Sequence, residues 1–381
     1  MTNFICDGFQ YAKPTLAKKY FLTHFHSDHY GGITSKWGNG IIYCSHATAN
    51  LIHEQLGVQK QYIISLPMNT PTTILDTYLS NNNSHQDDNH KPVVVTLLDA
   101  NHCPGAIMFL FQINEKQILH VGDFRWDRMK MLKIPSLAGF ASSKLQLDLL
   151  MLDTTYCNEK YSKLPTQEEA ILAAIDVMKK EMKLERSMCR TFFKSPKSSN
   201  DFCMDKTLFL FGAYSIGKER IYLSVAKHFG KKVYVDSRRL KLIRAFNWPA
   251  AEMNIFTTNK SESDIWVVPL GHIRFDTLSE KYLGTSMSNH KGLALPHKYD
   301  RVVGFRPTGW AFSPTRKDIV SKRTNNKCTI YGVPYSEHSS FSELVDCLIC
   351  LKPKEIIPTV SVSKSQEQVE LLLNAVRLKT Y

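Results

Sequence analysis

Three histidines and an aspartate lie within six residues near the start of the chain, in the order His24, His26, Asp28 and His29. They follow Tyr20–Leu22, an apolar segment typical of the end of a buried strand. Side chains alternate between the two faces of an extended backbone, so His24 and His26 point the same way and can reach one ion. The loop that follows can turn Asp28 and His29 toward a neighbouring position. Imidazole and carboxylate together suit zinc or a related transition metal better than magnesium or calcium. The cluster therefore predicts a metal site rather than a solvated histidine-rich loop.

Three more candidate metal-site residues each follow a candidate strand. Asp7 follows the apolar residues 4–6, His102 follows the run 93–98, and Asp123 follows the run 118–122. With the His-x-His-x-Asp-His pattern, this ordered set resembles the metallo-β-lactamase superfamily. The resemblance implies one or two zinc ions, with other divalent metals accepted at the second site.

The same resemblance implies a role for each of these residues. One metal ion would be held by three histidines: His24, His26 and His102. The second would be held by Asp28 and His29, with Asp123 bridging the pair. Asp7 would support a ligand histidine from behind. His120 neighbours Asp123 but lacks ligand spacing, so we expect it to support the site rather than to coordinate metal.

Downstream, the resemblance narrows to the β-CASP nucleases. Residues 148–156 resemble their motif A, and residues 335–340 resemble motif B, whose histidine, His338, would complete the second metal site. At motif C the chain carries Val360, as DNA-processing relatives do, where RNA-processing relatives carry histidine. Residues 98–106, 212–219 and 305–310 are similar to the nitrogen-mustard-sensitivity family of DNA interstrand cross-link repair exonucleases. The residues expected to carry catalysis are Asp28, His29, Asp123 and His338.

The expected fold is α/β: a metallo-β-lactamase αββα sandwich with an inserted β-CASP α/β domain. Residues 1–160 would form the first part of the sandwich, 161–328 the insertion, and 329–381 the return. In the first half, short apolar runs predict strands at 41–44, 63–66, 93–98, 107–113, 118–121 and 149–152, and a helix is expected at 47–56. Residues 81–90 are a polar low-complexity run, expected as a disordered surface loop.

From Thr166 the pattern changes to alternating helices and strands. Helices are expected at 167–184, 218–229, 342–351 and 366–377, and strands at 207–211, 232–235 and 355–360. The basic stretch 185–206 is expected as a second surface insertion. The chain would return to the sandwich at 329–331, bringing His338 back to the metal site.

A Gly-x-x-x-x-Gly-Lys run at Gly212–Lys218 follows an apolar strand and opens a helix, as a nucleotide-binding P-loop does. Glu219 stands where such a loop needs serine or threonine for magnesium, which argues against an NTPase. Backbone N–H groups at a helix start, with a lysine beside them, still attract phosphate. The family resemblance implies a pocket for a terminal 5′-phosphate, lined by Asp153, Thr155, Ser215, Lys218 and Ser339.

The chain has 381 residues, a formal net charge of +13 and a pI near 9.2. Such an excess of positive charge favours a polyanionic partner, here DNA. Arg306 and Trp310 could pair a phosphate contact with base stacking. Four basic residues on one expected helix could contact the DNA backbone: Arg238, Arg239, Lys241 and Arg244. For Arg306 and Trp310, an equal alternative is a structural turn. For the four helix residues, it is a solvated charged face.

The expected activity is that of a metal-dependent 5′-to-3′ DNA exonuclease of interstrand cross-link repair. A metal-bound hydroxide would hydrolyse the phosphodiester, and a 5′-phosphate end would be preferred. The alternatives are an Artemis-like structure-specific endonuclease, an RNA-processing β-CASP nuclease and a catalytically silent DNA-binding scaffold. Nine cysteines without paired spacing, no signal segment and no membrane span favour an intracellular protein, and the resemblance places it in the nucleus. The sequence begins directly at the expected catalytic domain, and no recruitment module can be read in it.

Overall fold

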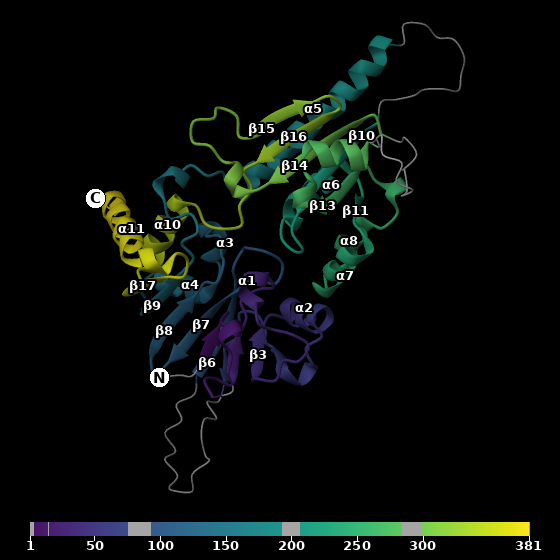
Figure 1. Cartoon of the computed structure of the whole chain (residues 1–381). Coiled ribbons are helices and arrows are strands. Elements are labelled where there is room, and N and C mark those ends of the chain that lie inside the picture. The colour runs from purple at the N-terminus through teal and green to yellow at the C-terminus, as the bar shows by residue number, and fades with distance from the viewer. Residues whose placement is uncertain (1–3, 14, 75–92, 193–205, 284–298, 381) are drawn as a thin grey trace, which may run out of the picture. The chain divides into compact units, whose positions relative to one another are not determined.

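The computed structural model describes residues 4–13, 15–74, 93–192, 206–283 and 299–380, which divide into two compact units (Figure 1). Unit 1 comprises residues 1–163, 245–247 and 337–381, and unit 2 comprises residues 164–244 and 248–336. Unit 2 is therefore inserted into unit 1 along the chain.

Unit 1 contains two sheets. The first is wholly parallel and has the order β1 (Phe4–Cys6), β2 (Lys19–Phe21), β3 (Ile41–Cys44) and β4 (Ile63–Ser65). The second has the order β17 (Glu355–Pro358), β9 (Leu149–Leu152), β8 (Lys116–His120), β7 (Ile107–Ile113), β6 (Val93–Asp99) and β5 (Thr72–Ile74). Strands β6, β8, β9 and β17 run the same way, because β7 is antiparallel to both β6 and β8.

The two sheets share one apolar core. Phe21 of the first sheet lies 5.3 Å and 5.0 Å, between ring centroids, from Phe109 and Phe111 of the second. Val95 and Leu97 of β6 are fully buried in the same cluster. Face-to-face packing of two sheets over such a layer is the arrangement of a sandwich.

Helices cover the outer faces of the sandwich (Figure 1). On the side of the first sheet lies α2 (His46–Leu56), which contacts β4 and buries Leu51 and Ile52. On the other side lie α4 (Pro135–Ala141), α10 (Phe341–Leu351) and α11 (Ser365–Thr380), which pack on one another and on β17. Two one-turn helices, α1 (Ser27–Tyr30) and α3 (Arg128–Met131), follow β2 and β8 in the chain. The expected αββα sandwich is confirmed.

Unit 2 is built on a seven-stranded sheet. Its order is β12 (Phe256–Thr257), β11 (Val233–Tyr234), β13 (Ile265–Pro269), β10 (Thr207–Ala213), β14 (Arg301–Pro307), β16 (Cys328–Val333) and β15 (Ser321–Asn325). All neighbouring pairs are parallel except β15 and β16. Its helices are α5 (Gln167–Phe192), α6 (Glu219–Phe229), α7 (Ser237–Ala245), α8 (Ala250–Met253) and α9 (Phe275–Thr277). The inserted domain is α/β, as expected.

Two expectations on organisation need correction. Helix α5 continues to Phe192, although a surface insertion was expected from Glu185. Strand β16, placed at the return to the sandwich, pairs with β14 and β15 in unit 2, and unit 1 resumes only at Glu337. The expected loop at 81–90 and most of the expected insertion at 185–206 lie outside the described residues.

Candidate metal centre

The candidate ligands lie just after strand ends in unit 1. His24, His102 and Asp123 are each the third residue after a strand, namely β2, β6 and β8. Asp7 and Asp153 directly follow β1 and β9. Because β6, β8 and β9 run the same way, their carboxyl ends meet at one edge of the second sheet. The loop after β2 of the first sheet reaches the same edge, since the carbonyl oxygen of Thr23 accepts the backbone N–H of Ile107 on β7 at 3.0 Å. The topology therefore gathers these side chains.

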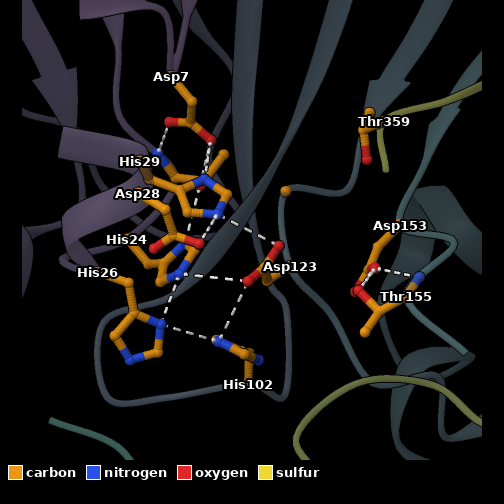
Figure 2. A network of polar contacts seen from close by, with 12 residues as sticks. Asp7, His24, His26, Asp28, His29, His102, Asp123, Asp153, Thr155 and Thr359 are labelled. Atoms are coloured by element: carbon orange, nitrogen blue, oxygen red, sulfur yellow. Dashed lines mark hydrogen bonds and ion pairs between the residues drawn. The ribbon is translucent and has the colours of Figure 1, made fainter. Parts of the chain in front are cut away.

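Asp123 lies at the centre of the cluster (Figure 2). Its Oδ1 is 3.3 Å from Nε2 of His29. Its Oδ2 is 3.6 Å from Nε2 of His24, 3.7 Å from Nε2 of His102 and 3.9 Å from Nε2 of His338. Oδ1 thus faces His29, whereas Oδ2 faces His24, His102 and His338, so this carboxylate would be shared by any metal ions that these histidines hold.

The histidine nitrogens also face one another. Nδ1 of His26 is 2.9 Å from Nε2 of His24 and 3.3 Å from Nε2 of His102. Imidazole nitrogens this close need a proton or a metal ion to offset the repulsion of their lone pairs. Three groups of side chains bring their ligand atoms within 4.8 Å of one another: His24, His26, His102 and Cys103; His24, His29 and Asp123; and His102, Asp123 and His338. This donor set fits one or two divalent transition-metal ions.

Asp7 organises the first side of the centre. Its Oδ2 accepts from Nδ1 of His29 at 2.7 Å and from the hydroxyl of Thr23 at 2.7 Å. Since the Thr23 proton is given to Asp7, Oγ1 of Thr23 accepts from Nδ1 of His24 at 3.0 Å. Nε2 of the neutral His24 is then free of a proton for a metal ion, whereas Nε2 of His29, which lies 3.3 Å from Oδ1 of Asp123, must give up its proton to a metal ion. Such hydrogen bonds to the outer nitrogen orient metal-binding histidines.

Gly122 makes room for this relay. Its φ is +57°, and a Cβ there would lie 2.7 Å from Cβ of Thr23 and 2.9 Å from Oγ1 of Thr23. A larger residue would displace the hydroxyl that joins Asp7 to His24.

The other side is organised by Glu337 and Asp153. Nδ1 of His102 donates to the carbonyl oxygen of Glu337 at 2.8 Å, and Nδ1 of His338 donates to Oδ2 of Asp153 at 2.8 Å. The buried Asp153 also accepts from the amide of Phe124 at 3.3 Å, and from the amide and hydroxyl of Thr155 at 3.0 Å and 2.6 Å. These contacts favour a role in orienting His338, in place of the expected phosphate contact.

The charges of the cluster follow from burial and close neighbours. Burial, together with the other histidines, lowers the pKa of His24 well below its usual range. Burial and the adjacent His338 lower the pKa of His102 to about 4. Both are therefore neutral at pH 7, as metal ligands must be. Burial alone would lower the pKa of His29, but hydrogen bonds to Asp123 and Asp7 raise it to about 11. Burial would raise the pKa of Asp123, yet His29 and the other histidines hold it well below its usual range.

Asp28 and His120 lie at the edges of the site. The side chain of Asp28 is 77% exposed, and its Oδ2 lies 3.8 Å from Nε2 of His29. His120 is buried on β8, where its Nδ1 accepts the amide N–H of Gly122 at 3.1 Å. Burial lowers the pKa of His120. His120 is in none of the three ligand groups formed by the described residues.

The expected phosphate-binding residues are divided between the units. Ser339 of unit 1 is buried, and its hydroxyl accepts from the amide of Trp126 at 2.9 Å and donates to the carbonyl of Phe124 at 3.2 Å. In unit 2, Ser215 is exposed in the Gly-rich turn. Lys218 caps α6 with a φ of +71°, and its Nζ lies 5.3 Å from the ring centroid of Tyr335. Lys218 is buried, so of these residues only Ser215 is exposed, and the pocket stays a prediction.

The expected DNA-binding residues divide by exposure. Three on α7 are exposed and spaced by three residues, so they share one face: Arg238, Lys241 and Arg244. Arg306 is also exposed, and the Trp310 side chain is 67% exposed. Arg239 needs correction, because it is buried and its guanidinium donates to the carbonyls of Tyr214 at 2.7 Å and Ser215 at 3.4 Å. It holds the Gly-rich turn.

Sequence reasoning missed three residues of the centre. Thr23 and Cys103 are chain neighbours of ligand histidines, and their polar side chains were the available signal. Glu337 acts through its backbone carbonyl, for which no side-chain signal exists.

Comparisons with known proteins agree with this geometry. A family model described as "Metallo-beta-lactamase superfamily" matches residues 20–153, and one described as "DNA repair metallo-beta-lactamase" matches residues 250–364. The chain is 37% identical over 375 residues to human DNA cross-link repair 1A protein, covering 97% of this chain and 31% of that protein. It is 36% identical over 370 residues to DNA ligase 6 of Arabidopsis thaliana, covering 95% and 23%. It is 32% identical over 344 residues to chicken 5′ exonuclease Apollo, covering 90% and 59%.

The chain thus spans less than two thirds of the length of each of these relatives. Among the described residues, no helix combines the length and apolar character needed to cross a bilayer.

Proposed function

The chain belongs to the DNA-repair metallo-β-lactamase family, and from this premise we propose that it is a metal-dependent nuclease that hydrolyses phosphodiester bonds in DNA. The observation that carries the proposal is the arrangement of four histidines, namely His24, His29, His102 and His338, around the carboxylate of Asp123, with His26 beside His24 and His102. Divalent ions held there, zinc in our proposal, would lower the pKa of a bound water and neutralise charge developing on a phosphoryl group. Since relatives of the chain include proteins named for DNA cross-link repair, we place its action in the nucleus.

The residues of the chain would divide the work. His24, His26 and His102 would hold one ion, and Asp28, His29 and His338 would hold the second, with Asp123 shared by both. Asp28 is exposed, and its Oδ2 lies 3.8 Å from Nε2 of His29. Oδ2 of Asp28 would accept a proton from the attacking water. Asp7 and Asp153 would keep His29 and His338 in the tautomer that presents Nε2.

We further propose that the enzyme is a 5′-to-3′ exonuclease acting in interstrand cross-link repair. Its relatives include a protein named as a 5′ exonuclease and others named for cross-link repair. A terminal phosphate monoester carries more negative charge than an internal diester, so a lysine and hydroxyl donors favour it. Lys218 and Ser215 are the residues we assign to that end.

The test is digestion of three DNA substrates that differ only at one end: a 5′-phosphate, a 5′-hydroxyl and a closed hairpin. We expect the 5′-phosphorylated strand to be shortened fastest, with mononucleotide products, and activity to disappear with a chelator and return with zinc. A hairpin opened faster than either free end is shortened would favour the second candidate, a structure-specific endonuclease. No metal-dependent cleavage of any substrate would overturn the nuclease proposal and leave a DNA-binding scaffold.

The end preference is tested with Lys218→Ala. A hydrogen bond to a charged group contributes roughly 1.5–3 kcal/mol, so removal of Lys218 should reduce the preference for a 5′-phosphate by about tenfold or more. Ser342→Ala is the control, because Ser342 on α10 donates to the carbonyl of Ser162 and is assigned no phosphate contact. If Lys218→Ala slows both free-end substrates equally, the terminal phosphate is bound elsewhere.

A further inference from the structure

The second metal position needs two segments that are far apart in sequence to lie side by side. Asp123 follows β8, whereas His338 lies beyond the inserted unit. The segments pair through Ser339. Its amide donates to the carbonyl of Phe124 at 3.0 Å, and its Oγ accepts the amide of Trp126 at 2.9 Å. These neutral hydrogen bonds lie one to three residues from the two ligands.

An ion pair reinforces this contact. The side chain of Arg125 is 2% exposed, and its Nη2 donates to Oε1 of Glu343 at 3.0 Å while its Nε donates to Oε2 at 3.2 Å. This two-pronged contact fixes direction as well as distance. The Arg125 backbone is also held, because its amide donates to the carbonyl of Ala100 and its carbonyl accepts from the side chain of Asn101, both at 3.0 Å. Arg125 thus joins the loops that carry Asp123 and His102.

Glu343 extends the connection to His338. Oε2 of Glu343 accepts the amide N–H of Ser340 at 2.7 Å, and the amide of Glu343 donates to Oγ of Ser340 at 3.2 Å. This capping box fixes the first turn of α10, which begins at Phe341, three residues after His338. The Glu343 carboxylate therefore contacts both segments. It binds Arg125, which is two residues after Asp123, and the amide of Ser340, which is two residues after His338.

We propose that Arg125 and Glu343 are positioning residues for the second metal ion, setting His338 against Asp123. The inference rests on the metal centre proposed above. Ligands must be held within about 0.5 Å of a productive geometry, and supporting side chains supply that precision. Without the pair, the segments are still joined next to the ligands by the hydrogen bonds of Ser339, and farther away by the contacts of Trp126 and Arg128 with Asp346. The His338 side should therefore lose affinity first. Affinity for the first ion should be kept, because the backbone of Arg125 holds the loop that carries His102, and a change of the Arg125 side chain leaves these backbone contacts in place.

The experiment measures zinc content and stepwise zinc affinity of the metal-free chain after reconstitution. The variants are Arg125→Met and Glu343→Gln, of which the second keeps a capping side chain at its position. We expect each to bind the first ion as wild type does and the second at least about tenfold more weakly. Arg125→Lys, which restores charge without the two-pronged contact, should recover part of the loss.

The matched control is Arg128→Met. Arg128 pairs with Asp346, so it joins α3 to the same helix one turn beyond Glu343, and its side chain is 49% exposed. This variant should bind both ions like wild type. Wild-type affinity for two ions in Arg125→Met and Glu343→Gln would overturn the inference, as would equal weakening of both ions or loss of the folded circular dichroism spectrum in both variants. A wild-type chain that binds no second ion would overturn the two-metal centre itself.

Discussion

Among the acidic residues of the metal centre, Asp28 differs in its exposure. Asp7 and Asp123 are 13% exposed and Asp153 is 1% exposed, whereas Asp28 is 77% exposed. Asp7 and Asp153 accept hydrogen bonds from His29 and His338, and Asp123 faces several histidines. These contacts hold the three carboxylates inside the site and away from solvent. Asp28 has its closest charged neighbour in His29, at 3.8 Å. A solvent-facing carboxylate at this place suits transfer of a proton between the site and water.

The change Asp28→Asn tests this role. We expect nuclease turnover to fall by about 10²–10⁴-fold, because general acid–base groups contribute that much. The melting temperature should stay near that of wild type, since an exposed side chain is replaced by one of similar size. Zinc content, turnover and thermal unfolding are measured on one preparation. Turnover within a fewfold of wild type at full zinc occupancy would remove Asp28 from the mechanism.

At this scale the sequence predicted which residues gather, but not what each contacts. The histidines and Asp123 could be found because ligand types at strand ends leave a local pattern. Asp153 and Arg239 were assigned to phosphate and DNA, while their contacts are with His338, Phe124, Tyr214 and Ser215. These partners lie 24 to 185 residues away in sequence, so no local pattern records them.

At the scale of elements, α5 is fastened to the unit 2 sheet by one buried carboxylate. Glu181 accepts from the hydroxyl of Tyr331 at 2.6 Å and from Arg301 at 2.6 Å, and Lys322 lies at 3.3 Å. These three partners stand on β16, β14 and β15. Burial alone would raise the pKa of Glu181, but the hydrogen bonds from Tyr331 and Arg301 lower it below the usual range.

The lowered pKa predicts a specific pH dependence. The stabilisation by Glu181 is fully present above the unfolded-state pKa, about 4.3, and is lost as pH falls through the lower folded-state value. Glu181→Gln should reduce the free energy of unfolding by roughly 3 kcal/mol at neutral pH, because a buried charge pair loses one partner. The difference from wild type should shrink as pH falls below about 4. Urea unfolding of both proteins at several pH values measures it.

The control for this comparison is Asp176→Asn on the same helix. Asp176 is 67% exposed and lies 3.6 Å from Lys179, so its removal should cost less than about 1 kcal/mol. A Glu181→Gln difference that stays constant from neutral to acid pH would contradict the ionic role and leave only a packing contribution.

Most elements could be predicted from apolar runs and capping residues. The helix expected from residue 167 begins there as α5, and Oγ1 of Thr166 accepts the amide of Glu169 at 3.1 Å. The end of α5 was misplaced because the polar, basic residues after Leu184 suggested a loop, although glutamate, arginine and methionine there also favour a helix. The sheet to which residues 328–333 belong depends on pairing with β14, which the sequence does not record.

At the scale of the whole molecule, the net charge of +13 favours DNA binding most where basic side chains are exposed and not already paired with carboxylates. Several lysines of unit 2 are already in ion pairs, among them Lys227, Lys231 and Lys232 with Glu252, Asp264 and Glu262. The α7 face formed by Arg238, Lys241 and Arg244 is exposed, and within the part of the chain that the structure describes none of its three side chains forms an ion pair. This face is our candidate for contact with the DNA backbone.

Replacing the three α7-face residues by glutamine should weaken DNA binding and flatten its salt dependence. Each phosphate contact contributes about 0.9 to the slope of log affinity against log salt on duplex DNA, so the slope should fall by about 2–3. Fluorescence anisotropy over a series of salt concentrations measures this slope.

The control replaces Lys227, Lys231 and Lys232 by glutamine, which changes the net charge equally. If both triple variants shift the slope alike, overall charge rather than the α7 face drives binding. A slope unchanged by the α7-face variant alone would place the contact elsewhere.

The insertion of unit 2 between Asp123 and His338 has a consequence for the chain as it is made. On a translating ribosome, His24, His26, His102 and Asp123 emerge before unit 2, and His338 emerges only after it. The first group of ligands is therefore synthesised early, while the second lacks His338, and His102 lacks the Glu337 carbonyl that orients it, until all of unit 2 has been synthesised. A product truncated within unit 2 would bind metal without a complete hydrolytic centre. In the proposed nuclease, the order of ligands along the chain would thus delay hydrolysis of DNA until both units exist.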